Sequence, residues 1–180
     1  MCEKGAAYMN RVRIVVALLV VLATASMARA ERIKATLIGY QEVPSVSTDA
    51  RGEFRAVIHR GDDAIDYELT FQGLQAPVTQ SHIHFAQKSV NGSIVIWLCG
   101  TATNPGPAGT QTCPQSGTIT GTITAANVIA AAAAQQLTAG ELDEVIAAIR
   151  AGVAYVNVHT AVSPGGEIRG QLRASDRDKD

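Results

Sequence analysis

The stretch Ala64-Ile-Asp-Tyr-Glu-Leu-Thr-Phe-Gln72 indicates the fold class of this chain. Its apolar residues Ile65, Tyr67, Leu69 and Phe71 alternate with polar ones. Because successive side chains of a strand point to opposite faces, this period of two predicts a strand with one face in a core and the other in solvent.

Similar stretches lie on both sides of this one and are separated by turn residues. We expect further strands at 33–38, 52–59, 78–85, 94–98, 118–122, 154–159 and 167–172. Asn91-Gly92 predicts a tight hairpin turn, since both central positions of such a turn favour positive φ. About eight short, regularly spaced strands predict an all-β, Greek-key-like antiparallel sandwich or barrel.

An alanine-rich segment at 125–151 interrupts the strand pattern. Its halves, 125–136 and 139–151, have helical spacing and predict a two-helix insertion. The second half opens with Thr138-x-x-Glu141, the pattern of a capping box, and Gly152 suits a left-handed helix end.

The first thirty residues differ from the rest. Basic residues precede an apolar run at 14–25, and Ala28 and Ala30 flank Arg29. This pattern predicts a cleavable signal peptide at 1–30, because about twelve apolar residues fall short of the roughly 20 that span a bilayer. A retained N-terminal anchor is the alternative. We expect one domain at 31–173, a disordered charged tail at 174–180, and a periplasmic or secreted location.

Residues 31–180 are weakly acidic. The signal holds four of the 15 basic and one of the 16 acidic residues, which leaves 11 basic and 15 acidic groups and a formal net charge of −4. This charge gives no reason to expect nucleic acid or, after signal cleavage, a membrane as partner. A protein partner stays open, and the pattern indicates no oligomeric state.

Two cysteines follow the signal, Cys99 and Cys113. An even pair in an exported chain predicts a disulfide, which would stabilise the loop between them by roughly 3 kcal/mol. Two free thiols, or a bond to another molecule, are the alternatives.

Three histidines are candidates for a metal site. In a strand, His82 and His84 share one face, while Asn157 and His159 share a face of the strand at 154–159. With Ile83 in the core, all three imidazoles would lie on the outer face of the sheet, and they would meet if the two strands are neighbours. This arrangement predicts a surface transition-metal site for one copper or zinc ion. The alternative is that these histidines are polar surface residues or hydrogen-bonding anchors.

Other chemistry has less support. We find no Gly-x-Ser-x-Gly elbow, His-Glu-x-x-His helix or phosphate-binding glycine loop in the sequence. Glu42 and Glu167 have no second carboxylate at a spacing typical of acid–base catalysis, and we expect Glu167 and Arg169 to form a structural charge pair. His59 is expected at a solvent-exposed turn. The sequence therefore favours a non-catalytic module over an enzyme.

Four blocks carry a resemblance to a known family: 35–44 (ATLIGYQEVP), 81–84 (SHIH), 155–160 (YVNVHT) and 164–172 (PGGEIRGQL). They resemble the CHRD domain, named for chordin and also found in exported bacterial proteins. The resemblance covers residues 31–173, and 125–151 is similar to an insertion in a bacterial subset.

The resemblance implies an all-β domain related in pattern to Cu/Zn superoxide dismutase. In chordin, such domains belong to a secreted antagonist of growth-factor signalling, which implies a structural or protein-interaction module as the alternative to metal binding. The family pattern carries over to three histidines, two acidic residues and two further motif residues: His82, His84, His159, Glu42, Glu167, Asn157 and Arg169. The chain lacks the additional histidines and the aspartate of the two-metal dismutase site, so a dismutase-type enzyme is the weakest of the three hypotheses.

Overall fold

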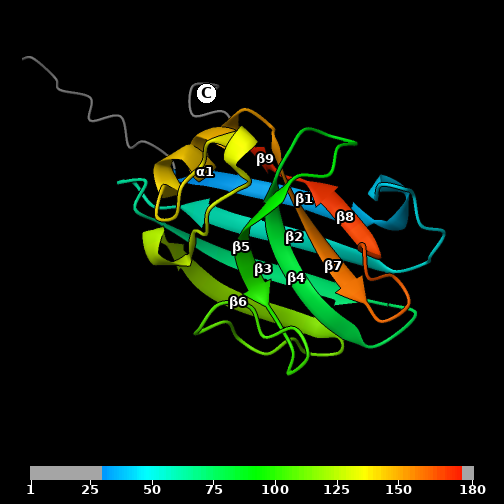
Figure 1. The fold of residues 1–180 in the computed structure, drawn as a ribbon. Helices are drawn as coiled ribbons and strands as arrows, with labels where there is room; N and C mark the ends of the chain where they lie inside the picture. Colours follow the sequence, from blue (N-terminus) through cyan, green and yellow to red (C-terminus); the bar gives the residue numbers. More distant parts are fainter. Residues whose placement is uncertain (1–29, 176–180) are drawn as a thin grey trace, which may run out of the picture.

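A computed structural model describes residues 30–175 (Figure 1). The predicted signal lies outside this range except for its last residue, and so does most of the predicted tail. All eight predicted strands are confirmed, and a short ninth strand follows them. The strands are β1 (Glu31–Ile38), β2 (Arg51–Ile58), β3 (Ala64–Gln72), β4 (Val78–Phe85), β5 (Ser93–Cys99), β6 (Gly117–Thr124), β7 (Ala154–Thr160), β8 (Ile168–Gln171) and β9 (Arg173–Ala174).

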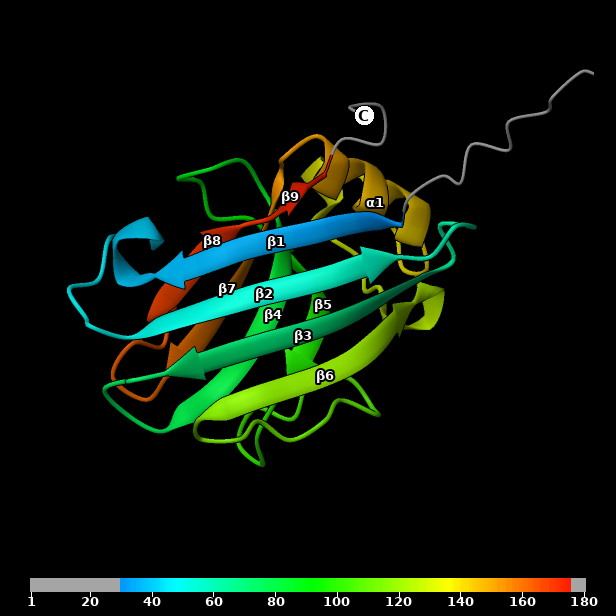
Figure 2. The ribbon, with the colours of Figure 1, turned by 180° about the vertical axis from the view of Figure 1, so that it is seen from behind.

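The strands form one antiparallel sheet that curls into a nearly closed barrel. Its order is β5-β4-β7-β8-β1-β2-β3-β6, and β9 pairs with β1. Figure 2 shows β1, β2, β3 and β6 as one layer in front of β4, β5 and β7. The hydrophobic core lies between the layers and includes Phe54, Leu69, Ile83 and Val156.

Strand β3 shows why the alternation predicted the fold. Tyr67, Leu69 and Phe71 are buried, whereas Glu68 and Gln72 are exposed. The strand pairs with β2 on one side and β6 on the other. Its apolar face is therefore one wall of the core, as the period of two requires.

The prediction of two helices at 125–151 is wrong. The first half holds only two short 3-10 turns, Ala125–Asn127 and Ala133–Gln135. Between these turns the backbone pairs with edge strand β5, where Val128 bridges Ile96 and the Ile129 amide donates to the Val95 carbonyl at 2.9 Å. These tertiary contacts outweigh the helix propensity of alanine, since propensity is a weak prior without an apolar stripe to bury.

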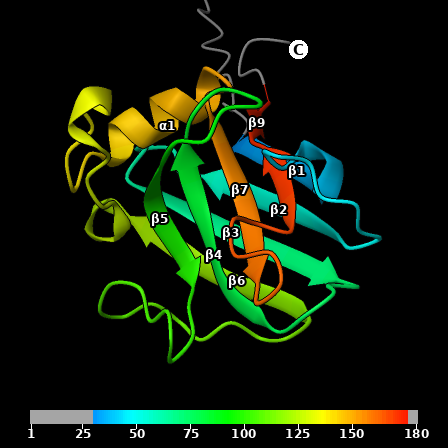
Figure 3. The same cartoon turned by 45° about the vertical axis from the view of Figure 1, so that its right-hand side comes forward.

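The second half does form a helix, α1 (Leu142–Arg150). Its apolar stripe packs into the core through Leu142, Val145, Ile146 and Ile149. Figure 3 shows α1 lying across one end of the barrel. Gly152 follows the helix with a φ of +71°, which confirms the predicted left-handed end.

The predicted disulfide is present. Cys99, the last residue of β5, is bonded to Cys113 across a sequence separation of 14. Short backbone bonds join the two ends of this loop, including the Cys113 amide to the Gly100 carbonyl at 2.8 Å. The bridge therefore fixes the long connection between β5 and β6.

The last described residues pair with β1. Ala174 pairs with Ile33 in β9, and the Ser175 amide donates to the Arg32 carbonyl. Among residues 30–175, the structure has no helix with the length and apolar character needed to cross a membrane.

Candidate metal centre

Strands β4 and β7 are hydrogen-bonded neighbours, which is the condition for the three histidines to meet. In their antiparallel register, His82 lies opposite Asn157 and His84 lies opposite Tyr155. Ile83 and Val156 point into the core. Since side chains alternate, the three imidazoles share the opposite face of the sheet, and this part of the prediction is confirmed.

The prediction that these histidines lie at the surface is wrong. The exposed fractions of His82, His84 and His159 are 0%, 7% and 5%. Three connecting segments contribute groups that contact this face, at 39–50, 86–92 and 161–167. The outward face of β4, β7 and β8 is thus a second, polar interior rather than a solvated surface.

Arg169 of β8 holds the segment at 86–92 against the barrel through hydrogen bonds. Its guanidinium donates to the carbonyls of Gln87 and Val90 and to Oδ1 of Asn91. The Asn91 amide nitrogen in turn donates to the Val43 carbonyl at 3.1 Å. One buried cation therefore joins two of the covering segments.

The prediction of a tight turn at Asn91-Gly92 is wrong. The connection between β4 and β5 spans 86–92, and the positive φ belongs to Ser89. Gly92 is required for a different reason, because a Cβ there would collide with the carbonyl oxygen of Phe85. The side chain of Asn91 serves the contacts with Arg169 and Val43 instead of a turn.

Hydrogen bonds to backbone carbonyls set the tautomers of two histidines. Nδ1 of His84 donates to the Gly92 carbonyl and Nδ1 of His159 donates to the Pro164 carbonyl, both at 2.9 Å. Because a carbonyl oxygen can only accept, these bonds place the ring proton on Nδ1 and leave a lone pair on Nε2. Metal-binding histidines are oriented in this same way.

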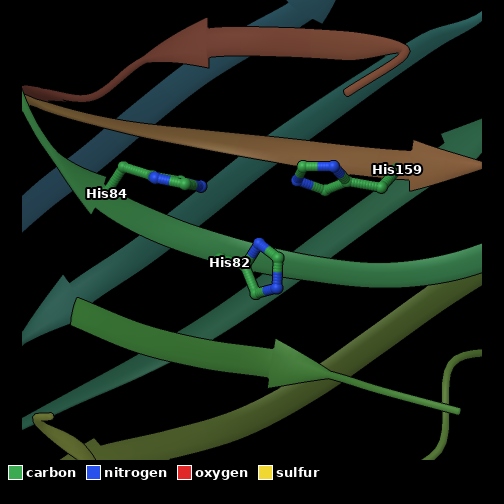
Figure 4. A group of neighbouring side chains, drawn as sticks. All are labelled: His82, His84 and His159. Carbon is green, nitrogen blue, oxygen red and sulfur yellow. The ribbon is translucent and has the colours of Figure 1, made fainter. Parts of the chain in front are cut away.

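The nitrogens that face one another have no hydrogen-bond partner. Nε2 of His84, Nε2 of His159 and both ring nitrogens of His82 are buried and unpartnered. Figure 4 shows Nε2 of His84 and of His159 pointing toward each other, with a nitrogen of His82 directed into the space between them. One ligand atom from each ring lies within 4.8 Å of the others.

The distances between these nitrogens are close to those between nitrogens that bind the same ion. Two nitrogens that each lie about 2.1 Å from one ion are at most about 4.2 Å apart. The centroids of the His82 and His159 rings are 4.8 Å apart, and those of His82 and His84 are 5.4 Å apart. Small side-chain movements would therefore bring three nitrogens to one centre.

Burial also keeps the cluster neutral. Desolvation lowers the pKa of His84 to about 4, and it lowers the pKa of His82 and of His159 as well. The neighbouring imidazoles lower the pKa of His82 further, because two positive rings would repel each other. At neutral pH the rings are thus uncharged, the form that binds metal ions.

Asn157 lies opposite His82 on the same face, and Glu42 lies close to Asn157. Burial raises the pKa of Glu42 to about 7, while Arg169 and the Asn157 amide act in the opposite direction. Gly166, with a φ of +122°, sits against both side chains, and a Cβ there would collide with Oε1 of Glu42 and lie 2.9 Å from Nδ2 of Asn157. This contact is a physical reason for glycine in the Pro-Gly-Gly-Glu block.

Glu167 and Arg169 do not form the predicted charge pair. The Glu167 carboxylate accepts from the Thr48 hydroxyl, the Gln75 amide and the Thr160 hydroxyl at 2.9, 2.9 and 2.7 Å. The carboxylate that acts on Arg169 is Glu42. Glu167 therefore ties three segments of the chain together.

Sequence reasoning missed two aromatic neighbours of the cluster. Tyr155 stacks on His84, and Trp97 meets His82 edge to face with ring centroids 4.3 Å apart. Tyr155 could have been found, since it lies two residues before Asn157 on the same strand face. Trp97 gave no such signal, because its contact depends on the pairing of β4 with β5.

His59 lies apart from the cluster. It follows β2, is exposed, and contacts a carboxylate oxygen of Asp66 at 2.8 Å. That contact raises the pKa of His59. Its place at an exposed turn agrees with the prediction and makes it a useful control.

A β-barrel with a buried cluster of three histidines on its outward face defines the class of this protein. The family model of the CHRD domain matches residues 33–172, so the chain belongs to the CHRD domain family. No curated protein and no solved structure matches it.

Proposed function

We propose that this CHRD domain is a non-catalytic module that binds one transition-metal ion, copper or zinc, through His82, His84 and His159. The observation that carries the proposal is the set of buried ring nitrogens without a hydrogen-bond partner. Leaving a buried polar group unpartnered costs about 1–3 kcal/mol. An ion bound to three of these nitrogens would compensate that cost.

The donor set supports copper or zinc. All three residues of the cluster offer imidazole nitrogen, which suits both ions, and two of them already donate Nδ1–H to carbonyls. The low pKa of these histidines removes proton competition at neutral pH. Their burial under connecting segments favours holding an ion over a dismutase-type reaction, which requires access for a substrate.

We further propose that the domain works outside the cytoplasm, in the periplasm or beyond the cell. The Cys99–Cys113 disulfide supports this location, because such bonds persist in oxidising compartments. The signal-like segment at 1–30 supports it independently.

Metal analysis of protein purified without a histidine tag tests the proposal. We expect close to one zinc or copper ion per chain after loading and dialysis. His82→Ala, His84→Ala and His159→Ala should each lose the ion, whereas the matched control His59→Ala should keep it. Equal metal content in all four variants would overturn the proposal.

A structural module without metal is the alternative. The bonds from His84 to the Gly92 carbonyl and from His159 to the Pro164 carbonyl favour it, because each fixes a covering segment. In that case a chelator should leave the Tm of the wild type unchanged. A metal-binding domain should instead gain stability with added ion, by mass action.

A further inference from the structure

Asn157 occupies the centre of the face that carries the histidines. It lies directly opposite His82 in the register of β4 and β7, where cross-strand Cβ atoms are about 5 Å apart. His159 follows it by two residues on the same face, and His84 is its diagonal neighbour across the strand pair. Asn157 is 1% exposed.

The amide of Asn157 has a defined orientation. Its Nδ2 and Oε1 of Glu42 both lie against the same side of Gly166. Oε1 makes no hydrogen bond, but the Asn157 side chain lowers the pKa of Glu42, as a nearby donor nitrogen does, whereas the flipped amide would set oxygen against oxygen. With Nδ2 turned to Glu42, Oδ1 is directed away from it.

Asn157 shares a face of the sheet with the histidines. The Asn157 side chain raises the pKa of both His82 and His84, as a nearby hydrogen-bond acceptor does. Yet Oδ1 is buried without a hydrogen-bond partner, like the ring nitrogens around it. Six unpartnered atoms, four of them nitrogens and two oxygens, thus belong to this region: Nδ1 and Nε2 of His82, Nε2 of His84, Nε2 of His159, Oδ1 of Asn157 and Oε1 of Glu42.

We infer that Oδ1 of Asn157 is the fourth donor of the metal site, an inference that rests on the proposed function. Zinc in a closed site takes four ligands in tetrahedral geometry, and three imidazoles leave one position. Asn157 and His159 from β7 would then form a pair at i, i+2 that matches His82 and His84 from β4. Glu42, behind the amide, would hold it in the ligating orientation.

Substitution at position 157 tests this role, with the zinc affinity and the visible spectrum of the Co²⁺-loaded protein as readouts. Asn157→Leu keeps the volume but removes the donor, so zinc affinity should fall on the order of tenfold or more and the tetrahedral Co²⁺ bands should change. Asn157→Asp keeps an oxygen donor, so zinc should bind at least as tightly as in the wild type.

Ser81→Ala is the matched control. Its hydroxyl donates to the backbone carbonyl of Asn157 at 2.7 Å, so this variant disturbs the same strand pair without touching the site. We expect a lower Tm with unchanged zinc affinity and Co²⁺ spectrum. Wild-type affinity and spectrum in Asn157→Leu would overturn the inference, and so would an Asn157→Asp variant as weak as Asn157→Leu.

A measurement on the wild type covers the case in which Asn157→Leu does not fold. The side-chain amide resonances of Asn157 should shift on addition of one equivalent of zinc, and unchanged resonances would overturn the inference. The two proposals fail separately. If the wild type binds neither zinc nor Co²⁺, the proposed function is overturned. If the wild type binds both ions, His84→Ala does not bind them and Asn157→Leu binds them as the wild type does, only the role of Asn157 is overturned.

Discussion

The imidazole of His84 lies flat against the phenol ring of Tyr155, with ring centroids 4.5 Å apart and planes within 4° of each other. The guanidinium carbon of Arg169 lies 3.3 Å from the centroid of the same phenol ring. Tyr155 therefore links a candidate metal ligand to the cation that fastens the segment at 86–92. The plane of the His84 ring is set by this stack and by its bond to the Gly92 carbonyl.

We predict that Tyr155→Leu weakens zinc binding by about tenfold, because the His84 ring loses the surface that fixes its plane. Tyr155→Phe keeps the stacked ring and should bind zinc as the wild type does. Competition with a chromophoric chelator measures both affinities. Equal affinities of Tyr155→Leu and Tyr155→Phe would contradict a role for the stack.

Glu42 gives a prediction about pH. Its pKa in the folded chain is raised from 4.5 to about 7, chiefly by burial. Its contribution to stability is therefore complete below pH 4.5 and is lost as the pH rises through 7, where burial of the carboxylate opposes folding. The full shift corresponds to on the order of 3 kcal/mol.

Glu42→Gln, which cannot ionise, should therefore be more stable relative to the wild type at pH 8.5 than at pH 5. Urea unfolding of the metal-free proteins at both pH values measures the difference. The histidines titrate in both proteins, so their effect cancels in the comparison. A stability difference independent of pH would show that Glu42 does not titrate in this range.

Glu167 gives a prediction about stability alone. Its buried carboxylate accepts from the Thr48 hydroxyl, the Gln75 amide and the Thr160 hydroxyl. Glu167→Gln turns a donor toward groups that need an acceptor, and it should lower the free energy of unfolding by about 2–3 kcal/mol in thermal or urea unfolding. Glu53→Gln is the control, because Glu53 pairs with Arg55 at the surface and such pairs contribute little. A similar loss of unfolding free energy in both variants would argue against a stabilising role for the three hydrogen bonds of Glu167.

Local sequence pattern predicted the strands and the shared face of the histidines, since both follow from the period of two. It could not predict that this face is buried. The cover depends on contacts distant in sequence, such as those from Arg169 to the carbonyls of Gln87 and Val90. The helix predicted at 125–136 is wrong for the same reason, because pairing with β5 decides its backbone.

Trp97 provides an optical test of the site, because it is the only tryptophan of the chain. Its ring centroid lies 4.3 Å from that of His82, so an ion bound to His82 would lie close to the indole. Cu²⁺ has a partly filled d shell and quenches indole fluorescence at short range, whereas Zn²⁺ with its filled shell does not. We therefore expect Cu²⁺ to quench the emission with an end point at one equivalent. One equivalent of Zn²⁺ added first should only slow the quenching, because Cu²⁺ binds imidazole nitrogen more tightly than Zn²⁺ and displaces it. His84→Ala should abolish the sharp end point while leaving Trp97 and its contact with His82 in place, and His59→Ala should retain it. Quenching with the same one-equivalent end point in His84→Ala would place the copper elsewhere on the chain.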